Sequence, residues 1–354
     1  MTPFRSALVL LALAASPVSA QPTTGKVQPD RIDLGTVYTG ATVEANFMVF
    51  EAGNNPNIKL EVTAPKFVKV LNQSTHAQQF GLGNNFVCGT VEIAIDTSAA
   101  GERSGEVAVT LGKTKARVPV TATVRPRRAG LIRLLIAETP FERYSTDDGE
   151  LFRAWTDLVK GAPVDVSYLL VTRGKPVLRD LDLGKYDCVF LGETGLVNLT
   201  PGDLKRVRAF AEEGGRVVVA ADAFMVGTVP EANKVLAGYG LQMRDEEARG
   251  MGLNNVTVGK EDLDPEVVKA GVKSVHFFRA SPVAVEPGKG ARVLARAVGA
   301  GKPGDAFVAM APAGKGEVIA IGQSLWWNWI GGERGARADN ARLLRWLLVP
   351  EKEV

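Results

Sequence analysis

The sequence has few of the side chains that most often carry chemistry. Its 354 residues include two cysteines, Cys88 and Cys188, and two histidines, His76 and His276, all far apart along the chain. A zinc site of the Cys/His type takes about four such ligands, usually in closely spaced pairs. The sequence therefore predicts no metal site, and nothing in its pattern calls for a cofactor. Because the two cysteines fall in different predicted domains, we expect two separate buried thiols rather than a disulfide.

The chain also lacks a strong excess of charge of one sign. The formal net charge is +3, and the one dense basic run is Arg125-Pro126-Arg127-Arg128. Binding to nucleic acid needs Lys and Arg clustered on one face. Nucleic acid is therefore not expected as a partner. The basic run lies where the hydrophobic pattern changes, and we interpret it as a solvated hinge.

Long apolar runs are absent after the first twenty residues. A membrane helix takes about 20 apolar residues, and no later segment reaches that length. Residues 1–20 have the pattern of a cleavable signal peptide, with Arg5, an apolar run over 7–15 and the small-x-small site Val18-Ser19-Ala20. We expect a mature chain that begins at Gln21, has no transmembrane segment after signal cleavage, and is periplasmic or secreted.

Short segments with a period of two extend from residue 27 to residue 125, separated by Gly, Asn and Pro. Apolar and polar side chains alternate most clearly over 58–62, 91–95 and 107–111. Such alternation places one face of a strand in a core and the other in water. Strands at this spacing over about 100 residues predict an all-β sandwich.

The opening of this region carries a family resemblance. Residues 32–40, Ile-Asp-Leu-Gly-Thr-Val-Tyr-Thr-Gly, resemble the start of periplasmic immunoglobulin-like domains of the DUF1573 and ASPM/SPD-2/Hydin group. The turn over 96–105 and the segment 117–124 are also similar to that group. The resemblance implies an immunoglobulin-like β-sandwich over 27–125 that binds or spaces and carries no chemistry.

From residue 130 to residue 350, mostly apolar strand-like segments alternate with helical ones. The strand-like segments include 131–137, 164–171, 186–191 and 216–221, and a helix is expected over 149–160. Another helix should begin at Thr200, with Pro201 in its first position and Asp203 in its third. Alternation of strands and helices predicts an α/β domain with a flavodoxin-like, doubly wound parallel sheet.

Four segments of this half resemble the class I glutamine amidotransferase-like superfamily, in particular its exported DUF4350-like branches: 186–195, 214–222, 314–322 and 339–344. Active members of the superfamily place a Cys on the sharp turn after the second of these strands, and a His-x-Glu pair further on. Here Ala221-Asp222-Ala223 stands at that turn, and Gln323-Ser324 follows the later strand. The resemblance implies the fold without its catalytic residues, a pseudoenzyme, because no thiolate and base are present for acyl transfer.

Polar residues follow the predicted strands of this half where a ligand would bind. In open α/β sheets ligands lie outside the carboxyl ends of the strands. The residues expected there are Glu138, Glu193, Thr194, Asp222, Gln323 and Ser324. The acidic ones can bind a ligand or act as an acid/base pair, or they can simply cap helix N-termini, where free N–H groups favour a carboxylate.

Three of the five tryptophans, Trp326, Trp327 and Trp329, follow the last predicted strand. Their rings can stack on sugars, or they can fill the core beneath the final helix. We favour a non-catalytic exported envelope protein, whose α/β domain binds a small molecule, a glycan or an envelope protein and whose sandwich positions it. The alternatives are a carboxylate-dependent hydrolase of envelope or glycan material, and a structural component of a surface complex.

Overall fold

The computed structural model describes residues 25–80, 84–138, 158–171, 176–178, 181–223, 227–246, 255–299, 301–324 and 338–349. The predicted signal peptide, most of the helix expected over 149–160, and the three clustered tryptophans lie outside these residues. Strands account for 46% and helices for 18% of the structure, in several antiparallel and mixed sheets. The predicted fold class, a flavodoxin-like α/β parallel sheet after an immunoglobulin-like sandwich, is therefore wrong for this chain, which is mostly β.

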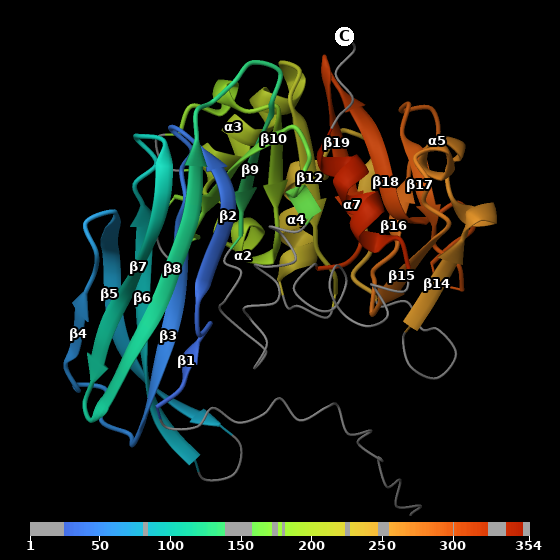
Figure 1. The fold of residues 1–354 in the computed structure, drawn as a ribbon. Coiled ribbons are helices and arrows are strands. Elements are labelled where there is room, and N and C mark those ends of the chain that lie inside the picture. The colour runs from blue at the N-terminus through green and yellow to red at the C-terminus, as the bar shows by residue number, and fades with distance from the viewer. Residues whose placement is uncertain are drawn as a thin grey trace, which may run out of the picture.

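The N-terminal part of the chain forms two four-stranded sheets, drawn in blue to teal in Figure 1. The first sheet has the order β1 (Val27–Gln28), β3 (Glu44–Ala52), β6 (Asn84–Ile95) and β5 (Val68–Phe80). The second has the order β2 (Ile32–Tyr38), β8 (Thr114–Arg125), β7 (Gly101–Leu111) and β4 (Leu60–Thr63). Strand β2 runs parallel to β8, and the other neighbours in these sheets are antiparallel.

Alternating side chains explain how these sheets pack. Val107 and Val109 on β7 are buried, as are their inward-facing neighbours Val118 and Val120 on β8. Phe47 on β3 is fully buried as well, and all of these residues belong to one hydrophobic core. The prediction of strands from the period-two pattern is confirmed for 91–95 and 107–111, whereas over 58–62 the strand begins only at Leu60.

The C-terminal part forms a nine-stranded mixed sheet. Five neighbouring strands are parallel: β10 (Val164–Leu169), β9 (Ile132–Ala137), β11 (Cys188–Leu191), β12 (Arg216–Ala220) and β19 (Gly316–Ile321). The other four are antiparallel to their neighbours: β18 (Ala306–Ala313), β16 (Val283–Val285), β13 (Leu241–Met243) and β17 (Arg292–Arg296). A separate hairpin pairs β14 (Asn255–Gly259) with β15 (Ser274–Phe278).

A short turn explains why the sheet does not continue in parallel. Strand β18 ends at Ala313 and β19 begins at Gly316, so only Gly314 and Lys315 connect them. A parallel connection needs a crossover of roughly a dozen residues, whereas two residues suffice for a hairpin. Gly314 has a φ of 60°, which a glycine adopts without steric cost. The chain therefore turns back, and half of the sheet becomes antiparallel.

The helices are few and mostly short: α2 (Glu193–Val197), α3 (Pro201–Glu212), α4 (Thr228–Leu236), α5 (Pro265–Lys269) and α7 (Asn340–Leu348), with 3₁₀ turns η1 (Leu183–Lys185) and η2 (Lys260–Asp262). The predicted start of α3 is confirmed, because Thr200 and Asp203 form a reciprocal capping box with Pro201 in the first turn. Within the described ranges, none of these helices has both the length and the apolar character needed to cross a bilayer.

Candidate functional site

The predicted polar residues follow four strands that are neighbours in the sheet. Glu138 follows β9, Glu193 and Thr194 follow β11, Asp222 follows β12, and Gln323 and Ser324 follow β19. Because these strands are adjacent and parallel, in the order β9, β11, β12 and β19, their carboxyl ends meet at one edge. The structure therefore brings the six residues to the same edge of the sheet.

Glu138 caps a helix that follows a different strand. Its Oε1 accepts hydrogen bonds from the Thr194 hydroxyl at 2.6 Å and from the Thr194 backbone N–H at 3.2 Å. The N-cap of α2 is Gly192, which has no side chain to offer. A Cβ at Gly192 would lie 1.2 Å from Glu138 Oε2, so the space that this atom would take holds the carboxylate. The expectation that acidic residues cap helices thus holds for Glu138.

Asp222 instead joins two strand ends. Its Oδ2 accepts a hydrogen bond from the Ser324 N–H at 2.8 Å, and its backbone carbonyl accepts one from the Thr228 hydroxyl at 2.7 Å. The helix that follows, α4, has Gly227 as its N-cap and receives no side-chain cap. Asp222 is buried, and its carboxylate fixes the end of β19 against the end of β12.

Gln323 and Ser324 are also buried. The Gln323 Oε1 accepts a hydrogen bond from the Phe278 N–H at 2.9 Å and so attaches β15 to the end of β19. The Ser324 hydroxyl is enclosed and has no hydrogen-bond partner among the described residues. Sequence reasoning missed Ser281, whose hydroxyl accepts a hydrogen bond from the Ala223 N–H at 2.7 Å. No local pattern marks that serine, because its partner lies on another element.

The described carboxylates at this edge are not grouped as a cation site would require. Among the described residues, no group of three or more His, Cys, Asp or Glu side chains is placed to hold a metal ion. Glu193 is buried at the first position of α2, where a negative charge is favoured by the helix N-terminus. The edge is therefore built from hydrogen bonds between elements. Trp326, Trp327 and Trp329, expected either to stack on a ligand or to fill the core, lie outside the described residues.

Both cysteines are free and buried, which confirms the expectation of two separate thiols. Burial raises the pKa of Cys188 to about 12 and the pKa of Cys88 to about 11. A thiol with such a pKa stays protonated at neutral pH, and only the thiolate is a good nucleophile. Cys188 lies inside β11 rather than on an exposed turn, so neither its position nor its ionisation suits nucleophilic catalysis.

His276 is held by two other polar side chains. Its Nδ1 is 3.2 Å from the Thr257 hydroxyl on the facing strand β14. The amide of Asn340, at the start of α7, accepts from the His276 N–H and donates to the His276 carbonyl, both at 2.8 Å. These contacts join the hairpin to α7 at His276.

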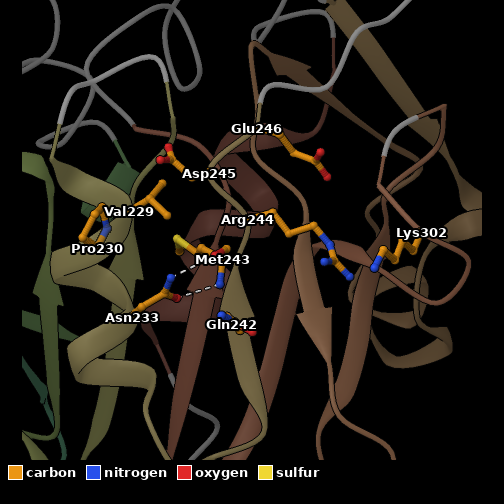
Figure 2. A pocket seen from close by; sticks show the side chains of 9 residues that line it. All are labelled: Val229, Pro230, Asn233, Gln242, Met243, Arg244, Asp245, Glu246 and Lys302. Atoms are coloured by element: carbon orange, nitrogen blue, oxygen red, sulfur yellow. Dashed lines mark hydrogen bonds between the residues drawn. The ribbon is translucent and has the colours of Figure 1, made fainter.

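A pocket of about 470 Å³ lies beside α4 and β13, and none of the predicted site residues lines it. Its lining includes Val229 and Asn233 from α4, Met243 from β13, and Arg244, which follows that strand (Figure 2). The Asn233 amide accepts from the Met243 N–H at 2.8 Å and donates to the Met243 carbonyl at 2.9 Å. This pocket could not be predicted from the sequence, because its walls come from separate segments.

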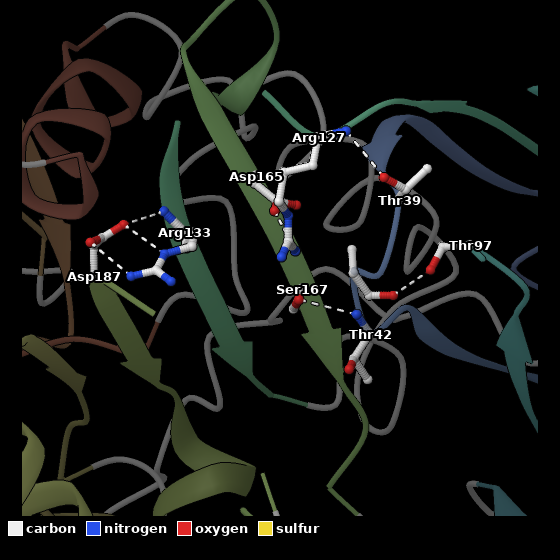
Figure 3. A network of polar contacts seen from close by, with 9 residues as sticks. Thr39, Thr42, Thr97, Arg127, Arg133, Asp165, Ser167 and Asp187 are labelled. Carbon is white, nitrogen blue, oxygen red and sulfur yellow. Dashed lines mark hydrogen bonds and ion pairs between the residues drawn. The ribbon is translucent and has the colours of Figure 1, made fainter. Parts of the chain in front are cut away.

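The N-terminal sheets are joined to the mixed sheet along its edge strand β10 (Figure 3). Val43 and Tyr168 form a parallel β-bridge, and the Tyr168 N–H donates to the Thr42 carbonyl at 2.8 Å. The Thr42 N–H in turn donates to the Ser167 hydroxyl at 3.2 Å. The buried Glu44 carboxylate accepts from the Leu170 N–H at 3.0 Å. The segment before β3 thus pairs with an edge that would otherwise be exposed.

An ion pair reinforces this joint. The Arg127 Nη2 lies 2.6 Å from the Asp165 Oδ2, and the Asp165 side chain is only 1% exposed. Burial raises the pKa of Asp165, while the charges of Arg127 and Arg133 oppose that rise. The basic run at 125–128 is exposed, as a solvated hinge would be, but Arg127 attaches it to β10. The basic run is therefore solvated but attached to the edge strand at Arg127.

No protein-family model matches the chain, and no curated protein matches it. Several solved structures are weakly similar, including the three that follow. A cytoplasmic protein from Salmonella typhimurium LT2 has 14% identity, covering 62% of this chain and 100% of that one, with a TM-score of 0.44. A β-galactosidase from Bacillus circulans sp. alkalophilus has 16% identity, covering 55% and 28%, with a TM-score of 0.38. An exo-β-1,4-mannosidase from Opitutaceae bacterium strain TAV5 has 13% identity, covering 63% and 37%, with a TM-score of 0.39. At these scores no activity is transferred to this chain.

Proposed function

We propose that this is an exported, non-catalytic binding protein, in which the mixed-sheet region binds a ligand or partner and the N-terminal sheets hold that region in a fixed orientation. The ligand classes that we favour are a glycan, a small molecule or another protein of the cell envelope. The binding surface in this proposal is the sheet edge that carries Glu138, Glu193, Thr194, Asp222, Gln323 and Ser324, together with the sequence neighbours Trp326, Trp327 and Trp329.

The observation that carries the proposal is the joint on β10. Contacts from Thr42, Val43, Glu44 and Arg127 all reach residues 165–170, and they combine backbone pairing, a buried carboxylate and an ion pair. A flexible linker would leave these groups in solvent. A joint with this many fixed contacts favours a protein whose two parts act at a set angle, as a positioning role requires.

The chemistry of the sheet edge supports a non-catalytic role. The Glu138 and Asp222 carboxylates accept hydrogen bonds from Thr194 and Ser324, which are contacts between elements of the same fold. A general acid or base has to exchange a proton with a substrate, and a carboxylate held in structural hydrogen bonds is poorly suited to that task.

A ligand screen by thermal unfolding tests the proposal. The probes are soluble glycans, peptidoglycan fragments and small metabolites, each added at about 100 times the dissociation constant where solubility allows, which adds roughly 2.7 kcal/mol for a true ligand. We expect at least one class of probe to raise the melting temperature of the protein, and we expect the mass of the probe itself to stay unchanged. Conversion of the probe to a product, detected by mass spectrometry and proportional to protein concentration, would contradict a non-catalytic role.

Single substitutions then locate the site. Trp326→Ala, Trp327→Ala and Trp329→Ala are each measured for stability and for affinity toward the probe found in the screen. A tryptophan in the site should cost affinity and little stability, whereas a core tryptophan should cost about 3–5 kcal/mol of stability. If all three variants lose stability alone, the sheet edge is not the binding surface.

A further inference from the structure

The pocket beside α4 has the size of a small-ligand site. Its volume is about 470 Å³, within the range of roughly 300–1,000 Å³ that such sites span. Its walls come from the first turns of α4, from the edge strand β13 and the residues after it, and from Lys302 in the loop before β18 (Figure 2). Its charged residues are two cations and two anions.

One end of the pocket holds an organised pair of cations. Arg244 donates from Nε to Asp305 Oδ2 at 2.6 Å and from Nη2 to Asp305 Oδ1 at 2.9 Å. The backbone N–H of Lys302 donates to the same carboxylate at 2.7 Å. The Asp305 side chain is 4% exposed, and the hydrogen bond from Arg244 lowers its pKa, so Asp305 stays ionised. One buried carboxylate therefore positions both cationic residues.

These two cations keep donors available. Within the parts of the chain that the structure describes, neither the Arg244 Nη1 nor the Lys302 ammonium has a hydrogen-bond or ion-pair partner. Figure 2 shows the Lys302 side chain pointing toward Arg244. With Asp305 counted, this end has a local charge of about +1, which favours an anionic group such as a carboxylate.

The remaining walls are apolar and acidic. Val229 and Met243 are buried side chains that give the pocket an apolar wall. Asp245 and Glu246 are exposed and lie above Arg244 in the view of Figure 2. The amide of Asn233 is engaged with the backbone of Met243, so it stiffens the wall rather than contacting a ligand.

We propose that this pocket binds a small zwitterion with an apolar side chain, the chemistry of a free α-amino acid. The ligand's carboxylate would face Arg244 and Lys302, its ammonium group Asp245 and Glu246, and its side chain the apolar wall of Val229 and Met243. The two acids would repel a simple anion, and the two bases would repel a simple cation. Only a ligand with both charges therefore matches the lining. This inference is independent of the sheet-edge site.

Three probes with the same isobutyl side chain test the charge pattern. Leucine has both charges, 4-methylpentanoate lacks the ammonium group, and 3-methylbutylamine lacks the carboxylate. Isothermal titration calorimetry on the full purified protein should show saturable binding of leucine, with each of the other two at least about tenfold weaker. No saturable binding of leucine at millimolar concentration would overturn the proposal, as would equal binding of 4-methylpentanoate.

Variants then place the binding in this pocket. Lys302→Ala keeps the backbone N–H that Asp305 needs, so it should fold normally and weaken leucine about tenfold or more. Glu246→Gln should weaken leucine but strengthen 4-methylpentanoate, because it removes one of the two acids that repel a simple anion. The matched control is Lys113→Ala, an exposed lysine on the turn between β7 and β8, which should bind leucine as the unaltered protein does. Equal affinities of the Lys302→Ala and Lys113→Ala variants would show that leucine binds elsewhere.

Discussion

At the N-terminus of α2 the capping carboxylate belongs to Glu138, which comes from a different part of the chain. Gly192 has an extended backbone that any residue can adopt, with φ −87° and ψ −171°. Its lack of a side chain matters because of space alone, since Glu138 Oε2 lies where a Cβ would be. The glycine and the glutamate therefore depend on each other, although neither marks the other in the sequence.

Substitution of this glycine tests the dependence. Gly192→Ala should push the Glu138 carboxylate away from Thr194 and lower the free energy of unfolding by about 1–3 kcal/mol, through the lost cap and local overpacking. Urea unfolding measures this change in the free energy of unfolding. The control is Gly202→Ala inside α3, where the nearest neighbouring atom is 3.7 Å from the added Cβ. That change should instead stabilise by up to about 1 kcal/mol, and equal effects of the two would contradict the packing argument.

The two buried thiols should make the protein less stable at alkaline pH. Burial raises the pKa of Cys88 to about 11 and of Cys188 to about 12, from an ordinary value of 9.0. The unfolded chain releases these protons first. The stability tied to the protonated thiols is therefore fully present below about pH 9 and is lost as the pH rises toward 11 and 12.

Urea unfolding between about pH 8 and about pH 10.5 measures this loss. The double variant Cys88→Ala/Cys188→Ala is the control for tyrosine and lysine titration, and its stability should fall less steeply over the same range. An identical slope in the variant would show that the thiols are not responsible.

Neither form of the protein should release ammonia from glutamine.

At the scale of elements, amide side chains complete the hydrogen bonding of strands. Asn233 bonds the backbone of Met243 on β13, Asn340 bonds the backbone of His276 on β15, and Gln323 accepts from Phe278 on the same strand. An amide presents one donor and one acceptor, as a peptide group does, so it can stand in for a neighbouring strand. This satisfies backbone groups that would otherwise be unpaired.

Asn233→Ala should therefore destabilise the protein by about 1–3 kcal/mol, because it leaves the N–H and the carbonyl of Met243 without their partner. Thermal unfolding followed by circular dichroism gives the change. Gln242→Ala on the same strand is the matched control, since Gln242 is exposed, and it should change stability by less than about 0.5 kcal/mol. If both variants have the same melting temperature as the unaltered protein, the Asn233 amide contributes no net stability.

At the scale of the whole molecule, the contacts on β10 should make the N-terminal sheets and the mixed-sheet region unfold together. Arg127 compensates a carboxylate that is buried and whose pKa is raised by that burial. The raised pKa means that the folded protein holds the Asp165 proton more tightly than the unfolded chain does. The stability linked to that proton is therefore present at acid pH and lost as the pH rises through the pKa of the folded state.

Arg127→Ala should cost about 2 kcal/mol at neutral pH, less than the roughly 3–5 kcal/mol of a fully buried pair because Arg127 is 41% exposed. The cost should shrink as the pH falls and Asp165 takes up a proton. The double variant Arg127→Ala/Asp165→Asn should recover most of the loss at neutral pH. A cost that does not change with pH, or no recovery in the double variant, would show that the ion pair does not hold the joint.

Local patterns were enough for features whose partners lie nearby in the chain. The capping box joins Thr200 and Asp203, which are only three positions apart. The strands at 91–95 and 107–111 follow from period-two alternation in the same way. The placement of the polar residues after β9, β11, β12 and β19 also follows from where each strand ends.

By itself, then, the sequence determined the elements, several of their ends and the separation of the two thiols. The tertiary structure decided how those elements pair with and contact one another. The antiparallel half of the mixed sheet follows from how β18 turns into β19, and the joint follows from Thr42, Glu44 and Arg127 meeting β10. The bond between Ser324 and Asp222 joins residues 102 positions apart, and that between Thr194 and Glu138 joins residues 56 apart. Periodicity and capping act over a few residues, whereas these contacts exist only once the chain has brought distant segments together.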